Sequence, residues 1–131
     1  MRIIIIEDNP ADVRLFKEAL KFSGIEVELS HFGDGMTALA MLQLREGPWN
    51  PPPHVVFLDL NMPRLSGFEV LEVLRGTPVC DGVRIVVLTS SQSPVDAENA
   101  ARLKADRFVR KPTELREFFT VISSTVRDLA A

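Results

Sequence analysis

The stretch VVFLDLNMPRLSG, from Val55 to Gly67, decides the fold of this 131-residue chain. Its first four residues are apolar, with two β-branched valines, as in a buried strand. The run stops on a carboxylate, Asp59, and Pro63 and Gly67 follow before the next apolar pattern begins. An acid at this point, with turn residues behind it, indicates that Asp59 stands at the edge of a sheet, where ligands bind in open α/β folds.

Four other apolar blocks of similar length are rich in β-branched residues. Together with HVVFLD (54–59) they predict five strands. The other four are RIIIIE (2–7), IEVELSHF (25–32), RIVVLT (84–89) and the weaker RFVR (107–110).

Segments with helical spacing lie between the strands, and each follows a residue that can cap a helix or begin one. The five pairs are Asn9-Pro10 before 11–22, Asp34 before 35–45, Ser66 before 67–75, Ser93-Pro94 before 95–103, and Thr113 before 114–126. In the last helix, Arg116, Glu117 and Arg127 can face water. The stripe expected to pack on the sheet is Leu115, Phe119, Ile122, Val126 and Leu129.

Strand and helix alternate five times, which predicts an α/β fold with a parallel sheet covered by helices on both faces. This doubly wound arrangement accounts for all of residues 1–131, so we expect one domain and no separate output domain. The common strand order for five such units, borrowed from known folds, is 2-1-3-4-5.

Composition excludes several classes of protein. A net charge of -3 argues against a general nucleic-acid binder, which needs basic residues gathered on one face. The single cysteine, Cys80, allows no internal disulfide and is expected to be an inert loop thiol, as suits a reducing cytoplasm. The run RIIIIED is too short to cross a bilayer, so we expect no membrane span and a cytoplasmic location.

The segment GPWNPPPH (47–54) is the one biased stretch in the chain. Consecutive prolines favour a stiff, extended surface connection. Trp49 either lies against the body of the domain or contacts a partner.

Strand order 2-1-3-4-5 places the first and third strands side by side. Glu7, Asp8 and Asp59 would therefore meet at one edge of the sheet. The same edge receives Thr89, with Ser90 and Ser91 behind it, and Lys111 after the fifth strand. Three carboxylates in one pocket repel, at about 4 kcal/mol per pair for a separation of about 4 Å at an effective dielectric constant near 20.

The repulsion predicts a bound cation. All the ligands are hard oxygens, so Mg²⁺ is favoured, with Mn²⁺ as a substitute. With the charge of Lys111 the site would be close to neutral and ready for an anion. An ionised Asp59 is itself a nucleophile, and a metal beside it can shield an approaching phosphoryl group, so the chemistry predicted is formation of an aspartyl phosphate.

Four motifs, in this order and spacing, resemble the receiver domain of response regulators of the CheY-like type. They are IIIIEDN (3–9), FLDLNMPRLSG (57–67), VVLTSS (86–91) and FVRKP (108–112). The resemblance covers essentially the whole chain. It implies a flavodoxin-like (βα)5 fold and a phosphorelay role in which Asp59 takes a phosphoryl group from the phosphohistidine of a sensor histidine kinase.

The same resemblance assigns further roles. Asp8 and Asp59 would bind Mg²⁺ through their side chains, Asn61 through its main-chain oxygen, and Glu7 through a metal-bound water. Thr89 and Lys111 would sense the phosphoryl group.

Phe108 stands where the family usually has an aromatic residue that turns inward as the switch residue Thr89 moves; plain core packing is the alternative. The switch would alter the face formed by the fourth helix, fifth strand and fifth helix. A homodimer could use the same face.

Within the family, the chain looks most like single-domain regulators paired with phytochrome-type histidine kinases, on EDNPADVRLFKEAL (7–20) and the segment 45–71. It departs from the family at Lys104, where a glycine is usual after the fourth helix; a positive φ there would disfavour lysine.

Three rival functions remain open. One is an interaction module of the same fold that works without phosphorylation. Another is a phosphatase of the Asp-x-Asp type, although Asn61 replaces its second acid, and the third is flavin binding, although the loop after the first strand is acidic. We expect the chain to catalyse only its own phosphorylation and dephosphorylation.

His31 and His54 are expected to be structural, since neither has acids or thiols beside it in the sequence.

Overall fold

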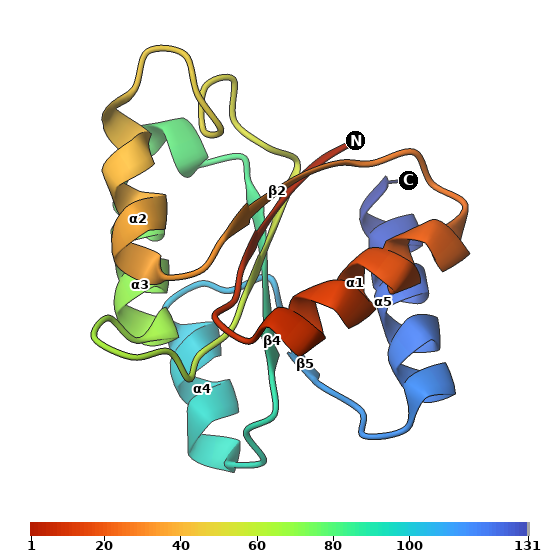
Figure 1. Cartoon of the computed structure of the whole chain (residues 1–131). Helices are drawn as coiled ribbons and strands as arrows, with labels where there is room; N and C mark the ends of the chain where they lie inside the picture. The colour runs from red at the N-terminus through yellow and green to blue at the C-terminus, as the bar shows by residue number, and fades with distance from the viewer. Residues whose placement is uncertain (131) are drawn as a thin grey trace.

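The structure is a computed structural model that describes residues 1–130. Five parallel strands form one sheet in the order β2-β1-β3-β4-β5. Figure 1 shows this sheet between two layers of helices. The strands are β1 (Arg2–Ile6), β2 (Glu28–Phe32), β3 (Val55–Leu58), β4 (Arg84–Thr89) and β5 (Arg107–Arg110). The predicted flavodoxin-like α/β fold and its strand order are confirmed.

Five α-helices cover the sheet, with α1 and α5 on one face and α2, α3 and α4 on the other (Figure 1). Their bounds are α1 (Pro10–Ser23), α2 (Gly35–Ala40), α3 (Gly67–Arg75), α4 (Pro94–Arg102) and α5 (Leu115–Ala130). Short 3-10 helices follow α2 and α3, at η1 (Met41–Gln43) and η2 (Pro78–Cys80). No helix within residues 1–130 is both long and apolar enough to span a membrane.

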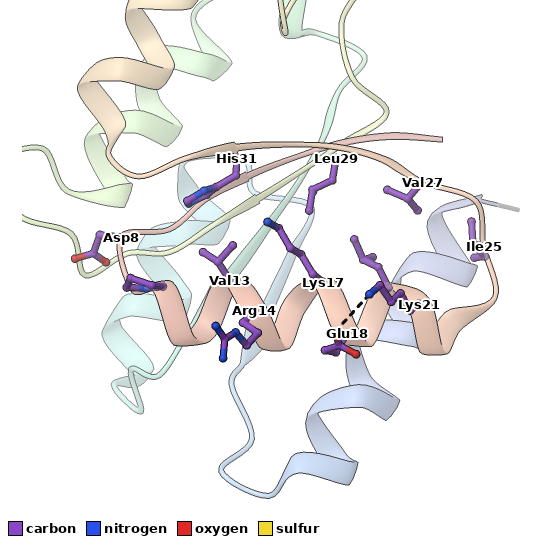
Figure 2. Close-up of a pocket in the computed structure, with 12 residues that line it drawn as sticks. Asp8, Val13, Arg14, Lys17, Glu18, Lys21, Ile25, Val27, Leu29 and His31 are labelled. Carbon is purple, nitrogen blue, oxygen red and sulfur yellow. Dashed lines mark ion pairs between the residues drawn. The ribbon is translucent and has the colours of Figure 1, made fainter.

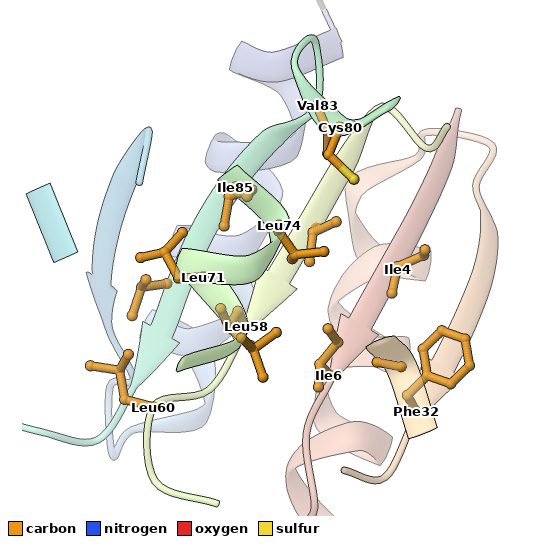
Figure 3. Packing of buried hydrophobic residues seen from close by; sticks show 14 of the residues in the cluster. Ile4, Ile6, Phe32, Leu58, Leu60, Leu71, Leu74, Cys80, Val83 and Ile85 are labelled. Atoms are coloured by element: carbon orange, nitrogen blue, oxygen red, sulfur yellow. The ribbon is translucent and has the colours of Figure 1, made fainter. Parts of the chain in front are cut away.

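The core has two halves because successive residues of a strand point to opposite faces. Ile3 and Ile5 of β1 pack against α1 and α5, whereas Ile4 and Ile6 pack beneath α2 and α3. Figure 3 shows the second half, in which Leu71 of α3 lies over the strands. This core fixes the carboxyl ends of β1 and β3 side by side.

The second helix is shorter than predicted. It ends at Ala40 rather than continuing to residue 45. The reason is Trp49, which is 1% exposed and whose indole Nε1 donates to the main-chain oxygen of Ala38 at 2.8 Å. That oxygen would otherwise accept from the amide of Leu42 in a continuing helix. The interpretation of Trp49 as packed against the body is therefore confirmed.

Three predicted caps are confirmed, at Asn9, Asp34 and Ser66, whose side chains accept first-turn amides of α1, α2 and α3. The helix start at Ser93-Pro94 is confirmed, with Ser93 as the N-cap residue and Pro94 as the first residue of α4, although the side chain of Ser93 makes no cap bond. The cap at Thr113 is wrong. Before α5, the carboxylate of Glu114 rather than the side chain of Thr113 accepts free amides, because its two oxygens reach the backbone N–H groups of Arg116 and Glu117.

The buried stripe of α5 is also partly wrong. Leu115 is 53% exposed, and Phe118, which lies one turn before Ile122, is 3% exposed in its place. Phe118 lies four residues before Ile122, which is about one helical turn. It is therefore nearer the centre of the buried face than Phe119. Phe119 and Leu129 lie at the margin of the core.

Lys104 has a φ of 69°, so the position after α4 does adopt the left-handed conformation that disfavours lysine. The lysine adopts a backbone conformation that glycine adopts more easily. The lysine that replaces the usual glycine therefore introduces local backbone strain.

Candidate functional site

The three acids meet at the carboxyl end of the sheet. Glu7 and Asp8 follow β1, and Asp59 follows β3, whose last residue pairs with Ile6. The amide of Asp59 donates to the oxygen of Ile6 at 3.1 Å, which ties the two chain ends together. One carboxylate oxygen from each of the three acids lies within 4.8 Å of the others. Glu7 and Asp59 are buried, whereas Asp8 is exposed.

Gly67 places Asp59 by allowing α3 to begin directly against the end of β3. A Cβ at this position would lie 2.2 Å from the oxygen of Asp59 and 2.6 Å from the Cα of Leu60. Neither backbone atom can move aside without shifting the strand end. The glycine at the end of the opening motif is therefore required by close approach of two backbones.

Burial changes the pKa of Glu7, one of the three acids of the site. Glu7 is 3% exposed, and burial raises its pKa from 4.5 to about 7. The hydrogen bond from Lys111 opposes this shift, and the charge of Asp59 adds to it. Without a cation, Glu7 therefore holds its proton well above the usual range for a carboxyl group.

The ammonium of Lys111 lies among the acids, with its amide donating to the oxygen of Thr89 at 2.8 Å. Nζ donates to Glu7 Oε1 and, at 2.8 Å, to Asp12 Oδ2, while Asp59 Oδ1 is 3.9 Å away. Burial tends to lower the pKa of Lys111, but the bonds to Asp12 and Glu7 outweigh it and raise that pKa.

Asp12 was missed by the sequence reasoning. It stands in the first turn of α1, five residues after Glu7, so its carboxylate returns to the same edge of the sheet. An acid in the first turn of a helix that starts at the site was the available indication.

Thr89 is fully buried at the end of β4. Its hydroxyl oxygen accepts from the amide of Ser91 at 3.2 Å and from Asn61 Nδ2 at 3.5 Å. Ser90 is exposed. The structure thus brings together Thr89 from the end of β4 and Asn61 from the loop after β3.

Phe108 is half-buried and packs on the core half that lies beneath α3 and α4. Its strand position pairs with Val87, two residues before Thr89. Both interpretations of Phe108 are consistent with this position.

The acids fit a hard divalent cation. All three donors are carboxylates, and Asp59 Oδ1 is buried with no hydrogen-bond partner among residues 1–130. A buried polar atom left without a partner costs about 1–3 kcal/mol, and more if charged. A cation shared by Glu7, Asp8 and Asp59 would remove that cost and the repulsion between the acids.

The two histidines do not join this site. His31 Nε2 lies 2.9 Å from the main-chain oxygen of Glu7, and His54 Nδ1 accepts from the amide of Arg2 at 3.0 Å. Both rings contact main-chain atoms, which agrees with the predicted structural roles. Cys80 is buried, and burial raises the pKa of its thiol, in agreement with an inert residue.

A groove of about 790 Å³ lies beside the acids, between α1 and β2, with Lys17 extending from the helix toward the strand in Figure 2. It exists because α1 packs against α5, which leaves the edge strand β2 half-covered on this side. Of the three acids of the site, Asp8 lines one end of the groove, whereas Glu7 and Asp59 do not line it. The chemistry lies at the strand ends rather than in this groove.

Comparison with known proteins agrees with this geometry. The family model described as response regulator receiver domain matches residues 3–123. Response regulator Rcp1 of Synechocystis sp. is 35% identical over 122 residues, which cover 92% of this chain and 82% of Rcp1. Response regulator MprA of Mycobacterium tuberculosis is 34% identical over 127 residues, or 97% of this chain; the chain spans about half of that longer relative, at 51%.

Solved structures are similar as well. The crystal structure of the Mn²⁺-bound form of Rcp1 has a TM-score of 0.83 at 34% identity, covering 94% of this chain and 89% of that one. The phosphorylated cyanobacterial phytochrome response regulator RcpA has a TM-score of 0.89 at 31% identity, covering 99% of this chain and 94% of that one. The chain therefore belongs to the response regulator receiver domain family of two-component signalling, with phytochrome response regulators among its homologues.

Proposed function

We propose that Asp59 accepts a phosphoryl group from the phosphohistidine of a sensor histidine kinase. A carboxylate oxygen of Asp59 attacks phosphorus, the bond from phosphorus to the imidazole nitrogen breaks, and that nitrogen keeps the electron pair and is reprotonated. The observation that carries the proposal is the buried Asp59 Oδ1, which has no hydrogen-bond partner among the described residues. A carboxylate has two oxygens, so one oxygen of Asp59 can bind the cation while the other attacks phosphorus.

The cation proposed for the acidic cluster is Mg²⁺, with Mn²⁺ as a substitute. Asp8 and Asp59 would bind it through carboxylates, Asn61 through its main-chain oxygen, and Glu7 through a bound water. When bound, the ion neutralises charge on the incoming phosphoryl oxygens. Carboxylate and carbonyl oxygens are the donors that such a hard ion prefers.

The remaining polar groups would hold the product. Lys111 Nζ lies 3.9 Å from Asp59 Oδ1, close enough to move onto a phosphoryl oxygen. Thr89 would donate its hydroxyl to another, giving up its present bonds to Ser91 and Asn61. That movement would free space beside β4 for Phe108 to turn inward.

The resulting change would alter the face formed by α4, β5 and α5 and its affinity for a partner. This face carries exposed apolar side chains, with Val95 at 59% and Leu115 at 53% exposure. We propose that phosphorylation controls a homodimer through this face. Size-exclusion chromatography with light scattering, with and without beryllofluoride, tests it, and an unchanged mass contradicts it.

A phytochrome-type histidine kinase is the proposed partner, supported by the likeness to Rcp1 and RcpA. We propose a cytoplasmic location for this exchange, and catalysis limited to the protein's own phosphorylation and dephosphorylation.

The direct test uses acetyl phosphate and Mg²⁺, with intact-mass spectrometry as the readout. We expect one added phosphoryl group in the wild type and none in Asp59→Asn. Asp81→Asn, which changes an exposed acid that follows η2 and lies outside the acidic cluster, is the matched control and should be modified like the wild type. Unmodified wild-type protein would favour the interaction module that works without phosphorylation, and turnover of phosphomonoesters would favour the phosphatase.

A further inference from the structure

Lys111 is shared among three carboxylates. Its side chain is 10% exposed, and its ammonium bonds to Glu7 and Asp12 while Asp59 Oδ1 stays at 3.9 Å. An ammonium has three protons to donate. In the resting protein, two of these protons are already directed at acids other than the phosphoryl acceptor.

Asp12 differs from the other two acids. It is not one of the three residues whose oxygens converge on the cation position. Glu7 and Asp59 can exchange their interaction with Lys111 for one with a cation, whereas Asp12 has no such alternative. Its bond to Lys111 spans 99 residues of sequence, from the first turn of α1 to the segment after β5.

We propose that Asp12 is a positioning residue that holds Lys111 in its resting place and so opposes the phosphorylated state. The inference rests on the proposed function, since it assumes that Lys111 must reach a phosphoryl oxygen on Asp59. Asp12 competes for the same ammonium. The balance between these two positions sets how tightly the site holds a phosphoryl group.

The competition gives the sign of the effect. Removing the charge of Asp12 weakens the resting position only, so it favours the state in which Lys111 contacts a phosphoryl oxygen. The Asp12 side chain is 30% exposed, which moderates the strength of the ion pair. We expect a change in affinity of about fivefold for a phosphoryl mimic, typical of a partly exposed charge-assisted bond.

The test measures beryllofluoride binding in saturating Mg²⁺, by calorimetry or NMR titration, for wild type, Asp12→Asn and Asp12→Glu. Asp12→Asn should bind about fivefold more tightly. Asp12→Glu keeps the carboxylate and should return toward the wild-type value. Glu18→Gln removes one acid of the same helix, which pairs with Lys21 at 3.6 Å, and should leave binding unchanged.

A second readout separates positioning from general effects on the site. Mg²⁺ alone should bind Asp12→Asn no more tightly than wild type, because Asp12 is not a ligand and its loss leaves the charge of Lys111 less neutralised. Unchanged or weaker beryllofluoride binding by Asp12→Asn overturns the role of Asp12, as does an equal gain in Glu18→Gln. Wild-type protein that binds no beryllofluoride overturns the proposed function itself, and the role of Asp12 with it.

Discussion

Magnesium binding is expected to release a proton from Glu7. This side chain is 3% exposed, and burial raises its pKa to about 7 in the metal-free protein. A divalent ion requires ionised ligands nearby, so protonated Glu7 must ionise before the ion is held well. With a pKa near 7, the ionised fraction rises from about one in eleven at pH 6 to about ten in eleven at pH 8, so the affinity rises about tenfold.

Calorimetry at pH 6, 7 and 8, in buffers of different ionisation enthalpy, measures both the affinity and the proton released. Glu7→Gln is the matched control, since it keeps the shape of the side chain and removes the titration. Its affinity should be flat over the range. His31→Gln is a second control, because the His31 ring lies 2.9 Å from the main-chain oxygen of Glu7. A wild-type affinity that does not change from pH 6 to pH 8 would refute the reasoning.

The same group predicts how stability depends on pH without metal. Because the folded-state pKa of Glu7 is raised, its contribution is full below the unfolded value of 4.5 and is lost as pH rises to about 7. The loss is on the order of 3 kcal/mol at about 1.4 kcal/mol per pH unit. Urea unfolding in EDTA should show a smaller decline for Glu7→Gln than for wild type between pH 5 and pH 8, and parallel curves would contradict the assignment.

Three further substitutions test the scaffold by urea unfolding. Gly67→Ala should cost about 3 kcal/mol, since its Cβ would lie 2.2 Å from the oxygen of Asp59, and a cost below about 0.5 kcal/mol contradicts the close approach. Trp49→Phe should cost about 2 kcal/mol through loss of its hydrogen bond to Ala38, and no loss would contradict that bond's importance. Lys104→Gly should stabilise by about 1 kcal/mol, because the backbone has a φ of 69°; destabilisation would show that no strain is relieved.

Much of the fold could be predicted because local patterns and topology agree. The apolar runs before Glu7, Asp59 and Thr89 are short and β-branched, and only a parallel sheet with covered faces accommodates them. The strand order then determines which acids meet. The meeting of Glu7, Asp8 and Asp59 followed from that order rather than from any local feature.

Two of the features that were missed depend on contacts between residues that are separated in the sequence. The early end of α2 results from Trp49 binding the oxygen of Ala38, which helical periodicity cannot indicate. The place of Lys111 depends on Asp12, an acid 99 residues away, which was read only as part of a helical pattern. Leu115 was assigned to the buried stripe because periodicity locates a face only to within one residue at a helix end.

The central claim is that the acids after β1 and β3 prepare Asp59 to receive a phosphoryl group. Its most direct test is radiolabelled transfer from an autophosphorylated phytochrome-type histidine kinase in Mg²⁺, followed by borohydride reduction and peptide mapping of the acyl phosphate. The account predicts that labelling requires Mg²⁺ and that borohydride reduces the acyl phosphate at Asp59. The Asp59→Asn variant should carry no label. Label at another residue, or equal labelling of Asp59→Asn, would contradict it.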